Sequence, residues 1–364
     1  SNNTASSDLY KWGFSLVAQW SSHLSAYDTT TIDISPSKLG NINMASLPAS
    51  FEQYPDFYDL DAKKVQGAGH LINPSTGLPY QTQIVKRGDY TRAIAEFWAD
   101  GPDSETPPGH WFTLLNYVDD HSLSTRNYKG EIEIKNKLRW EIYSYLLMGA
   151  SMHDVAISTW SLKGYYDYIR PISALRYMAD QGQSSDPSLP RYSKHGIPLV
   201  PGYIEMVKPT DSIAQINAGH VNKIKVRAWR GPYNIDVPPA GTAGVGWMLL
   251  GNWWPYQRPS FVTPPFAGYI SGHSTFSSAA AQILETVTGD PFFPGGMGEW
   301  DINKNEFLVF EDGPSESFKL QWATYQDAAA QSGLSRIWGG IHPPFDDIPG
   351  RIMGPAMGNQ VIEK

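Results

Sequence analysis

The sequence predicts an all-α fold, in which helical bundles carry long irregular N-terminal and connecting segments. Apolar residues recur at helical spacing in several long stretches, whereas strand signals are few and short. There is no internal repeat. We therefore interpret residues 1–364 as a single domain, with an irregular wrapping segment at 1–85 and a helical core at 88–180 and 266–364.

The first half of the chain predicts four helices. One covers about residues 8–25, the next begins at Gly88, and a third follows the break at residues 107–109. The longest is expected over about residues 132–160, where an apolar stripe at helical period consists of Leu138, Ile142, Leu146, Met152 and Val155 or Ala156. Small residues at 149–151 would let a neighbouring helix approach it closely.

The second half is less regular before it becomes helical again. Residues 181–265 are rich in Pro, Gly, Asn and Trp, which predicts a long excursion over the surface or over a site entrance. Helices are then expected at 272–287, with Ser271 as N-cap, and at 315–333, with Phe318, Trp322 and Tyr325 on one face. A last helix is expected to begin near Asp346.

Composition excludes several classes of function. The net charge of −8 argues against a broad basic surface for nucleic acid, and the absence of cysteine excludes disulfides, thiolate nucleophiles and cysteine-ligated metal sites. No apolar run is long enough to span a bilayer. Glycine motifs at 67–69 and 244–246 are too short for a dinucleotide loop, and we expect no haem, NAD or flavin.

The chain begins with Ser rather than Met, which we interpret as a processed form. A signal peptide would already have been removed from such a form. The expected location is therefore extracytoplasmic, either periplasmic or secreted.

Three separated fragments together predict an oxyanion site. They are residues 163–171 (KGYYDYIRP), residues 271–273 (SGH) and residues 335–346 (SRIWGGIHPPFD). The first and third supply three fixed positive charges, and the second begins a helix whose N–H groups bind anions. Taken singly, each fragment also fits a solvated charged face, an ordinary serine N-cap or a structural histidine.

The three fragments in this order resemble a known signature. The pattern is Lys, six residues, Arg-Pro, then Ser-Gly-His, then Ser-Arg, five residues, His, and it spans about half the chain. It is similar to the signature shared by vanadium-dependent haloperoxidases and type 2 phosphatidic acid phosphatases. The chain departs from it at Ile270, where the family usually has proline, which we interpret as a change in turn rigidity.

Flanking aromatic residues favour the haloperoxidase branch. Trp160 and Phe266, the latter following Pro264-Pro265, look like the halide-side wall of fungal chloroperoxidases. The small acid phosphatases are shorter and lack the long N-terminal half. The resemblance thus implies a haloperoxidase-like helical-bundle fold with vanadate as cofactor, although these aromatic residues are equally compatible with an ordinary core.

The resemblance also implies a role for each residue of the signature. His342 would be the axial vanadium ligand, and the remaining cofactor-binding residues would be Lys163, Arg170, Ser271, Gly272, His273 and Arg336. His273 and Lys163 would also be catalytic, the first as acid-base residue and the second by polarising peroxide.

Two carboxylates complete the predicted site. Asp346 would orient the ring of His342, and Asp100 would act in catalysis by pairing with His273 or an arginine. Asp346 is equally plausible as an N-cap, and Asp100 as a turn residue before Gly101.

The expected activity is oxidation of a halide, iodide or bromide, by hydrogen peroxide to hypohalous acid. Its partners would be peroxide, halide and a diffusible organic acceptor, with the oligomeric state open. The first alternative is an acid phosphatase-type phosphomonoesterase that uses His342 as nucleophile. The second is a non-catalytic protein that binds an oxyanion.

Overall fold

The computed structural model describes residues 4–99, 105–235 and 241–364, with side chains from residue 8 onward. Most of its regular structure is helical, which confirms the predicted all-α class. The α-helices are α1 (Thr4–Trp20), α2 (Tyr54–Phe57), α3 (Arg87–Phe97), α4 (Pro107–Asp120), α5 (Lys137–Tyr166), α6 (Pro171–Gln181), α7 (Ser212–Ile216), α8 (Gly272–Thr288), α9 (Tyr325–Trp338) and α10 (Pro344–Glu363).

The strands form small antiparallel sheets at the periphery. Three two-stranded sheets pair β1 (Thr31–Asp33) with β2 (Ile84–Lys86), β3 (Asn127–Tyr128) with β4 (Ile132–Glu133), and β8 (Gly298–Ile302) with β9 (Phe318–Trp322). A three-stranded sheet has the order β5 (Ile204–Met206), β6 (Ile224–Trp229), β7 (Val245–Leu249).

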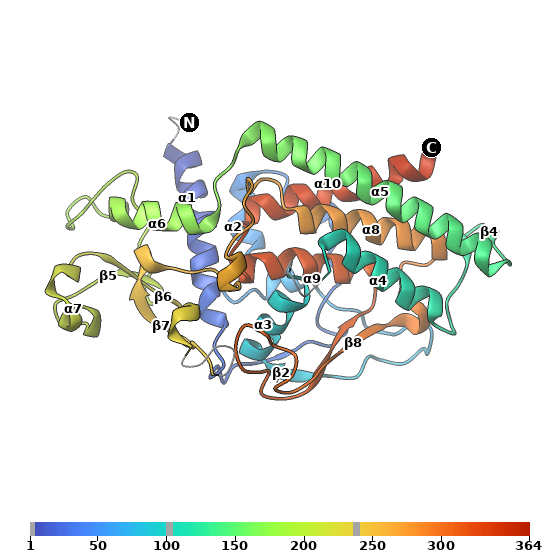
Figure 1. Ribbon diagram of the computed structural model, residues 1–364, viewed down its shortest axis with the longest axis horizontal. Coiled ribbons are helices and arrows are strands. Elements are labelled where there is room, and N and C mark those ends of the chain that lie inside the picture. Colours follow the sequence, from blue (N-terminus) through green and yellow to red (C-terminus); the bar gives the residue numbers. More distant parts are fainter. Residues whose placement is uncertain (1–3, 100–104, 236–240) are drawn as a thin grey trace.

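Helix α8 is the centre of the bundle. Nearly all of its side chains are buried, and it packs against α4, α5, α9 and α10 (Figure 1). Gly350, Gly354 and Gly358 form a line at four-residue spacing on α10, and a Cβ at Gly354 would lie 2.5 Å from the carbonyl oxygen of Thr275. The absence of side chains along this line lets α10 approach α8 closely, which places the N-terminal ends of the two helices side by side.

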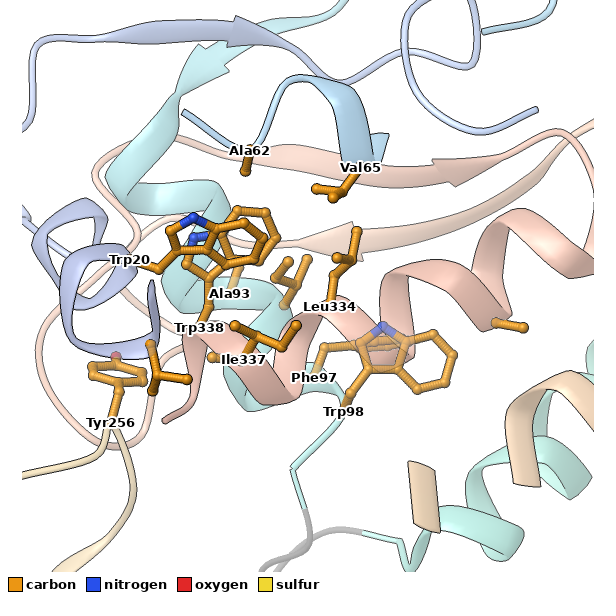
Figure 2. Close-up of a cluster of buried hydrophobic side chains, with 14 of the residues drawn as sticks. Trp20, Ala62, Val65, Ala93, Phe97, Trp98, Tyr256, Leu334, Ile337 and Trp338 are labelled. Atoms are coloured by element: carbon orange, nitrogen blue, oxygen red, sulfur yellow. The ribbon is translucent and has the colours of Figure 1, made fainter. Parts of the chain in front are cut away.

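The N-terminal segment is packed into the core through aromatic contacts. Trp20, at the end of α1, stacks on Trp338, at the end of α9, with ring centroids 4.7 Å apart (Figure 2). Both rings are buried, and Trp338 Nε1 donates to His23 Nδ1 at 3.2 Å. Burial of each large side chain contributes about 2–3 kcal/mol to the stability of the fold. The end of α9 that carries part of the predicted site is thereby held in position.

The predicted apolar stripe of the longest helix is exposed in its first half and buried in its second. Leu138, Ile142 and Leu146 are 64%, 59% and 65% exposed, whereas Trp140 and Met148 of the same helix are fully buried. The helix also begins five residues later than predicted, because Ile132 pairs with Tyr128 across a hairpin. Helical period alone does not determine burial, since the same stripe is exposed at Leu138 and buried at Met152 and Val155.

The helix predicted over residues 315–333 is wrong in its first half. Phe318–Trp322 form strand β9, in which Phe318, Leu320 and Trp322 are buried and Lys319 is exposed. This alternation has the two-residue period of a strand. The helix begins only at Tyr325, after a capping box formed by Thr324 and Asp327.

The excursion at 181–265 is more ordered than predicted. It contains the β5–β6–β7 sheet and the short helix α7, which lie with α6 at one end of the molecule, away from the long part of α5 (Figure 1). Strand β6 is buried at nearly every position, so this sheet packs against the core. None of the helices described is both long and apolar enough to cross a membrane.

Candidate active site

The three fragments of the sequence signature meet where several helix ends converge. Their residues are Lys163 in the last turn of α5, Arg170 at the N-cap of α6, Ser271, Gly272 and His273 at the start of α8, Arg336 in the last turn of α9, His342 between α9 and α10, and Asp346 in the first turn of α10. Each of these side chains is buried, as is the Gly272 backbone.

Lys163 and Arg170 are held by one stretch of backbone. Lys163 Nζ donates to the carbonyl oxygens of Ala267 and Gly268 at 3.0 and 2.8 Å, and Arg170 Nε donates to that of Phe266 at 3.0 Å. A lysine ammonium has three hydrogens, so one remains for an oxyanion. The loop before α8 therefore orients two cations without neutralising them.

The positive charges are close enough to perturb one another. Burial, together with the charge of Arg170, lowers the pKa of Lys163 to about 7. Burial and Arg336 lower the pKa of His273 well below its usual value, and burial and Arg170 do the same for His342. The site is thus strongly positive and contains two neutral imidazoles. A bound anion would stabilise such a cluster of positive charges.

The start of α8 offers hydrogen-bond donors. Ser271 Oγ accepts the N–H of Ser274 at 3.2 Å and caps the helix, while the N–H of Gly272 lies in the first turn, where no helical partner exists. The Ser274 hydroxyl lies 2.6 Å from Asp347 Oδ1 and 2.9 Å from Ser271 Oγ. A carboxylate can only accept, so the hydrogen of Ser274 goes to Asp347, and Ser271 keeps its own hydrogen to donate to Ser274 Oγ or to a ligand.

Arg336 and His273 are positioned by the same turn of α3. Arg336 Nη2 donates to the carbonyl oxygen of Ala95 at 2.5 Å, and Arg336 Nε contacts Ser335 Oγ at 3.0 Å. His273 Nε2 lies 2.7 Å from the carbonyl oxygen of Trp98, to which it donates. The C-terminal end of α3 therefore sets the orientation of a cation and of the candidate acid-base residue.

The tautomer of His342 follows from its two neighbours. Nδ1 lies 2.6 Å from Asp346 Oδ2, and Nε2 lies 3.2 Å from Arg170 Nη1. A guanidinium can only donate, so Nε2 carries the lone pair and the ring hydrogen is on Nδ1. Burial raises the pKa of Asp346 to about 7, against the opposing effect of Lys163 and Arg170. The arrangement gives His342 an orienting carboxylate on one side and a ligand lone pair on the other.

Trp160 and Phe266 form an aromatic wall beside the cations. Their ring centroids are 5.1 Å apart, and Lys163 Nζ lies 5.7 and 5.5 Å from the two rings. The rings are 41% and 38% exposed, so the wall borders solvent. A Cβ at Gly272 would touch the Trp160 ring at 3.6 Å, which places this wall next to the start of α8.

Sequence reasoning missed several supporting residues, and one predicted residue lies outside the described part of the chain. Asp100 is that residue. The missed carboxylate is Asp347, which accepts from Ser274, from Tyr58 at 2.8 Å and from Arg351 Nε at 3.0 Å. Two features of the sequence could have indicated Asp347. It directly follows Asp346, and it precedes Arg351 by four residues, the spacing of a common helical ion pair.

The donor set fits a tetrahedral oxyanion. Lys163, Arg170 and Arg336 supply charge, and Ser271 and Gly272 supply neutral donors. His342 adds the one lone pair that could bond to a metal at the centre of the anion. Among the described residues there is no group of three or more His, Cys, Asp or Glu side chains placed to hold a metal ion.

Comparison with known families gives a direct assignment. Residues 143–364 match the family model described as the VCPO second helical-bundle domain, which covers more than half of the chain. The chain belongs to the vanadium-dependent haloperoxidase family. The match includes Lys163, Arg170, the start of α8, Arg336 and His342, whereas residues 1–142 lie outside it.

Solved structures with a similar arrangement include bacterial enzymes of this kind. The holo and apo forms of a bacterial vanadium-dependent chloroperoxidase are each 17% identical, with TM-scores of 0.49 and 0.48, over 76% of this chain and 43% and 44% of theirs. A bacterial vanadium-dependent iodoperoxidase is 20% identical, with a TM-score of 0.41, over 75% of this chain and 43% of its own. This chain thus spans less than half the length of these proteins. No curated protein matches it in sequence.

Proposed function

We propose that this protein is a vanadate-dependent haloperoxidase that oxidises iodide or bromide with hydrogen peroxide to hypohalous acid. The observation that carries the proposal is the pair of contacts at His342, where Asp346 accepts from Nδ1–H and the Nε2 lone pair faces Arg170 Nη1, one of the three buried cations. A neutral imidazole oriented by a carboxylate is a common metal-ligand arrangement. Membership of the family supports it.

The residues that would hold vanadate are those of the oxyanion site. Lys163, Arg170 and Arg336 would neutralise its oxygens, Ser271 and Gly272 would donate hydrogen bonds, and His342 Nε2 would supply the bond to vanadium. Bound vanadate supplies a Lewis-acid centre that activates hydrogen peroxide for attack by halide.

His273 would move the proton. Its pKa lies well below the usual value, because of burial first and Arg336 second, so the ring is neutral at pH 7 and able to accept a proton from incoming peroxide. The hydrogen bond to the Trp98 carbonyl keeps the ring in one orientation. Lys163 would polarise the reacting oxygen with its remaining hydrogen.

Trp160 and Phe266 would form the halide side of the site. The wall lies against Lys163 and borders solvent, so a halide could approach the cations along apolar surface that displaces water. The hypohalous acid would leave to react with a diffusible organic acceptor. An extracytoplasmic location, periplasmic or secreted, is part of the same proposal.

The test compares two reactions of one preparation. Protein freed of metal would be incubated with orthovanadate and assayed for peroxide-dependent oxidation of iodide and bromide, and the vanadate-free protein for hydrolysis of a chromogenic phosphate ester. We expect vanadate-dependent halide oxidation that is lost in His342→Ala. Efficient ester hydrolysis with no vanadate-dependent oxidation of either halide would refute the proposal.

Phosphomonoester hydrolysis remains the second candidate because of a specific feature of the same site. With Asp346 on Nδ1, the lone pair of His342 Nε2 is also placed to attack phosphorus, and the three cations would stabilise the transition state. The two reactions use one residue set, so His342→Ala abolishes either and only the paired assay separates them.

A further inference from the structure

A second cavity lies beside the oxyanion site and is built almost entirely of aromatic rings. It has a volume of about 440 Å³, and eight of its ten lining side chains are Tyr, Trp or Phe. Tyr10, Phe51 and Tyr54 come from the N-terminal segment, whereas Tyr168 and Tyr269 come from the loops that carry Arg170 and Ser271. Small-molecule pockets typically measure roughly 300–1,000 Å³, so the volume suits a small organic ligand.

The rings support one another in a fixed arrangement. Tyr10 stacks on Phe345 with centroids 6.0 Å apart and meets Tyr168 edge to face at 5.9 Å. Tyr269 meets Tyr166 edge to face at 5.2 Å. Such pairs hold aromatic walls in place, so the cavity is largely formed before any ligand binds.

The fixed charge at the cavity lining is negative. Glu52 is the only charged side chain among the described residues that line it, and Lys, Arg and His do not contribute. The cations of the neighbouring site point elsewhere, since Lys163 and Arg170 donate to carbonyls at 266–268.

We propose that this cavity binds an organic cation, of the class of quaternary or alkylated ammonium compounds. Aromatic rings surrounding a cavity attract such a cation through their π faces, and Glu52 adds a carboxylate at the rim. Phe51 and Tyr166 are 54% and 55% exposed, so the rim is open to solvent. A carboxylate ligand would instead meet Glu52, whose negative charge repels an anion.

The experiment measures binding to the full chain without added vanadate, so it is independent of the proposed function. Choline and 3,3-dimethylbutan-1-ol, its uncharged isostere, would be titrated by calorimetry at constant ionic strength. We expect choline to bind at least about tenfold more tightly than the alcohol, because only the cation gains from the ring faces and Glu52. Equal affinities for the two compounds, or no detectable binding of choline at concentrations of about 10 mM, would overturn the proposal.

Variants at the exposed rim locate the site without disturbing the core. Phe51→Leu, Tyr166→Leu and Glu52→Gln are each expected to weaken choline binding by about two- to fivefold, the range for exposed cation–π contacts. Tyr177→Leu, which removes a similarly exposed tyrosine on α6, is the matched control and should bind as the wild type does. Choline binding that is unchanged in all three rim variants would place the cation elsewhere and overturn the assignment.

Discussion

His342 Nδ1 lies 2.6 Å from Asp346 Oδ2, four residues further along the chain. Both side chains are buried, and Arg170 Nη1 lies 3.2 Å from the other ring nitrogen, Nε2. The pair therefore decides which nitrogen of His342 has a lone pair to offer, and the first prediction concerns it.

Replacing Asp346 with Asn should weaken vanadate binding and any vanadate-dependent activity. The loss is expected to be about 10- to 100-fold, the usual effect of removing a carboxylate that orients a metal-ligating histidine. Activity titrated with orthovanadate measures it, and ¹⁵N NMR of the His342 ring reports the tautomer. Asp154→Asn, on the solvent side of α5, is the control. Wild-type affinity in Asp346→Asn would contradict the orienting role.

The affinity of the empty site for an oxyanion should fall as pH rises above 7. Burial and Arg170 lower the pKa of Lys163 to about 7, so its charge is present below that pH and is lost above it. Sulfate is suitable as the probe, because it does not titrate in this range. We expect a fall approaching about tenfold per pH unit, as for loss of one coupled proton.

Lys163→Arg tests the cause of that pH dependence. Arginine stays charged, so the affinity of this variant for sulfate should fall less steeply than that of the wild type between pH 7 and 9, with the remaining fall due to ionisation of Asp346. Binding to wild type that does not change over this range would show that Lys163 keeps its charge. Calorimetric titration at a few pH values is sufficient.

Ser274→Ala should destabilise the protein although Ser274 was not part of the predicted site. The variant keeps the N–H that Ser271 caps but removes the hydroxyl that donates to buried Asp347 at 2.6 Å. A hydrogen bond to a buried charge contributes about 1.5–3 kcal/mol, and chemical denaturation should show a loss of that size. Ser161→Ala, at an exposed position of α5, should change stability by less than about 0.5 kcal/mol. Equal stability of the two variants would exclude this role for Ser274.

Truncation should destabilise the protein strongly on the buried face of α5 and only slightly on its exposed face. Met148→Ala removes a fully buried side chain and is expected to cost about 2–5 kcal/mol. Leu146→Ala removes a side chain that is 65% exposed and should change the free energy of unfolding by less than about 1 kcal/mol. Denaturant midpoints of the two variants compare them directly, and a larger loss for Leu146→Ala would mean that this face is covered in solution.

The helices that were predicted correctly have strong local signals. The helices at α3, α4 and α8 begin at prolines, caps or glycine breaks that act within a few residues, and the sequence contains those signals. Residues 318–322 were assigned to a helix because Phe318, Trp322 and Tyr325 also fit helical spacing. The alternation of apolar and polar residues in 318–322 also fits a strand, and pairing with β8, some twenty residues earlier, decides between the two periods.

The candidate site, like the fold, was predicted from the sequence only in part. The sequence by itself determined the class of site that we propose, because three cations, a helix N-terminus and two histidines in this order predict an oxyanion site. Only the tertiary structure decided which nitrogen of His342 carries the lone pair, that Asp347 supports Ser271 through Ser274, and that an aromatic cavity adjoins the cations. Each of these depends on distances between residues far apart in the chain, which are set by close packing of α8 against α10 and of α1 against α9.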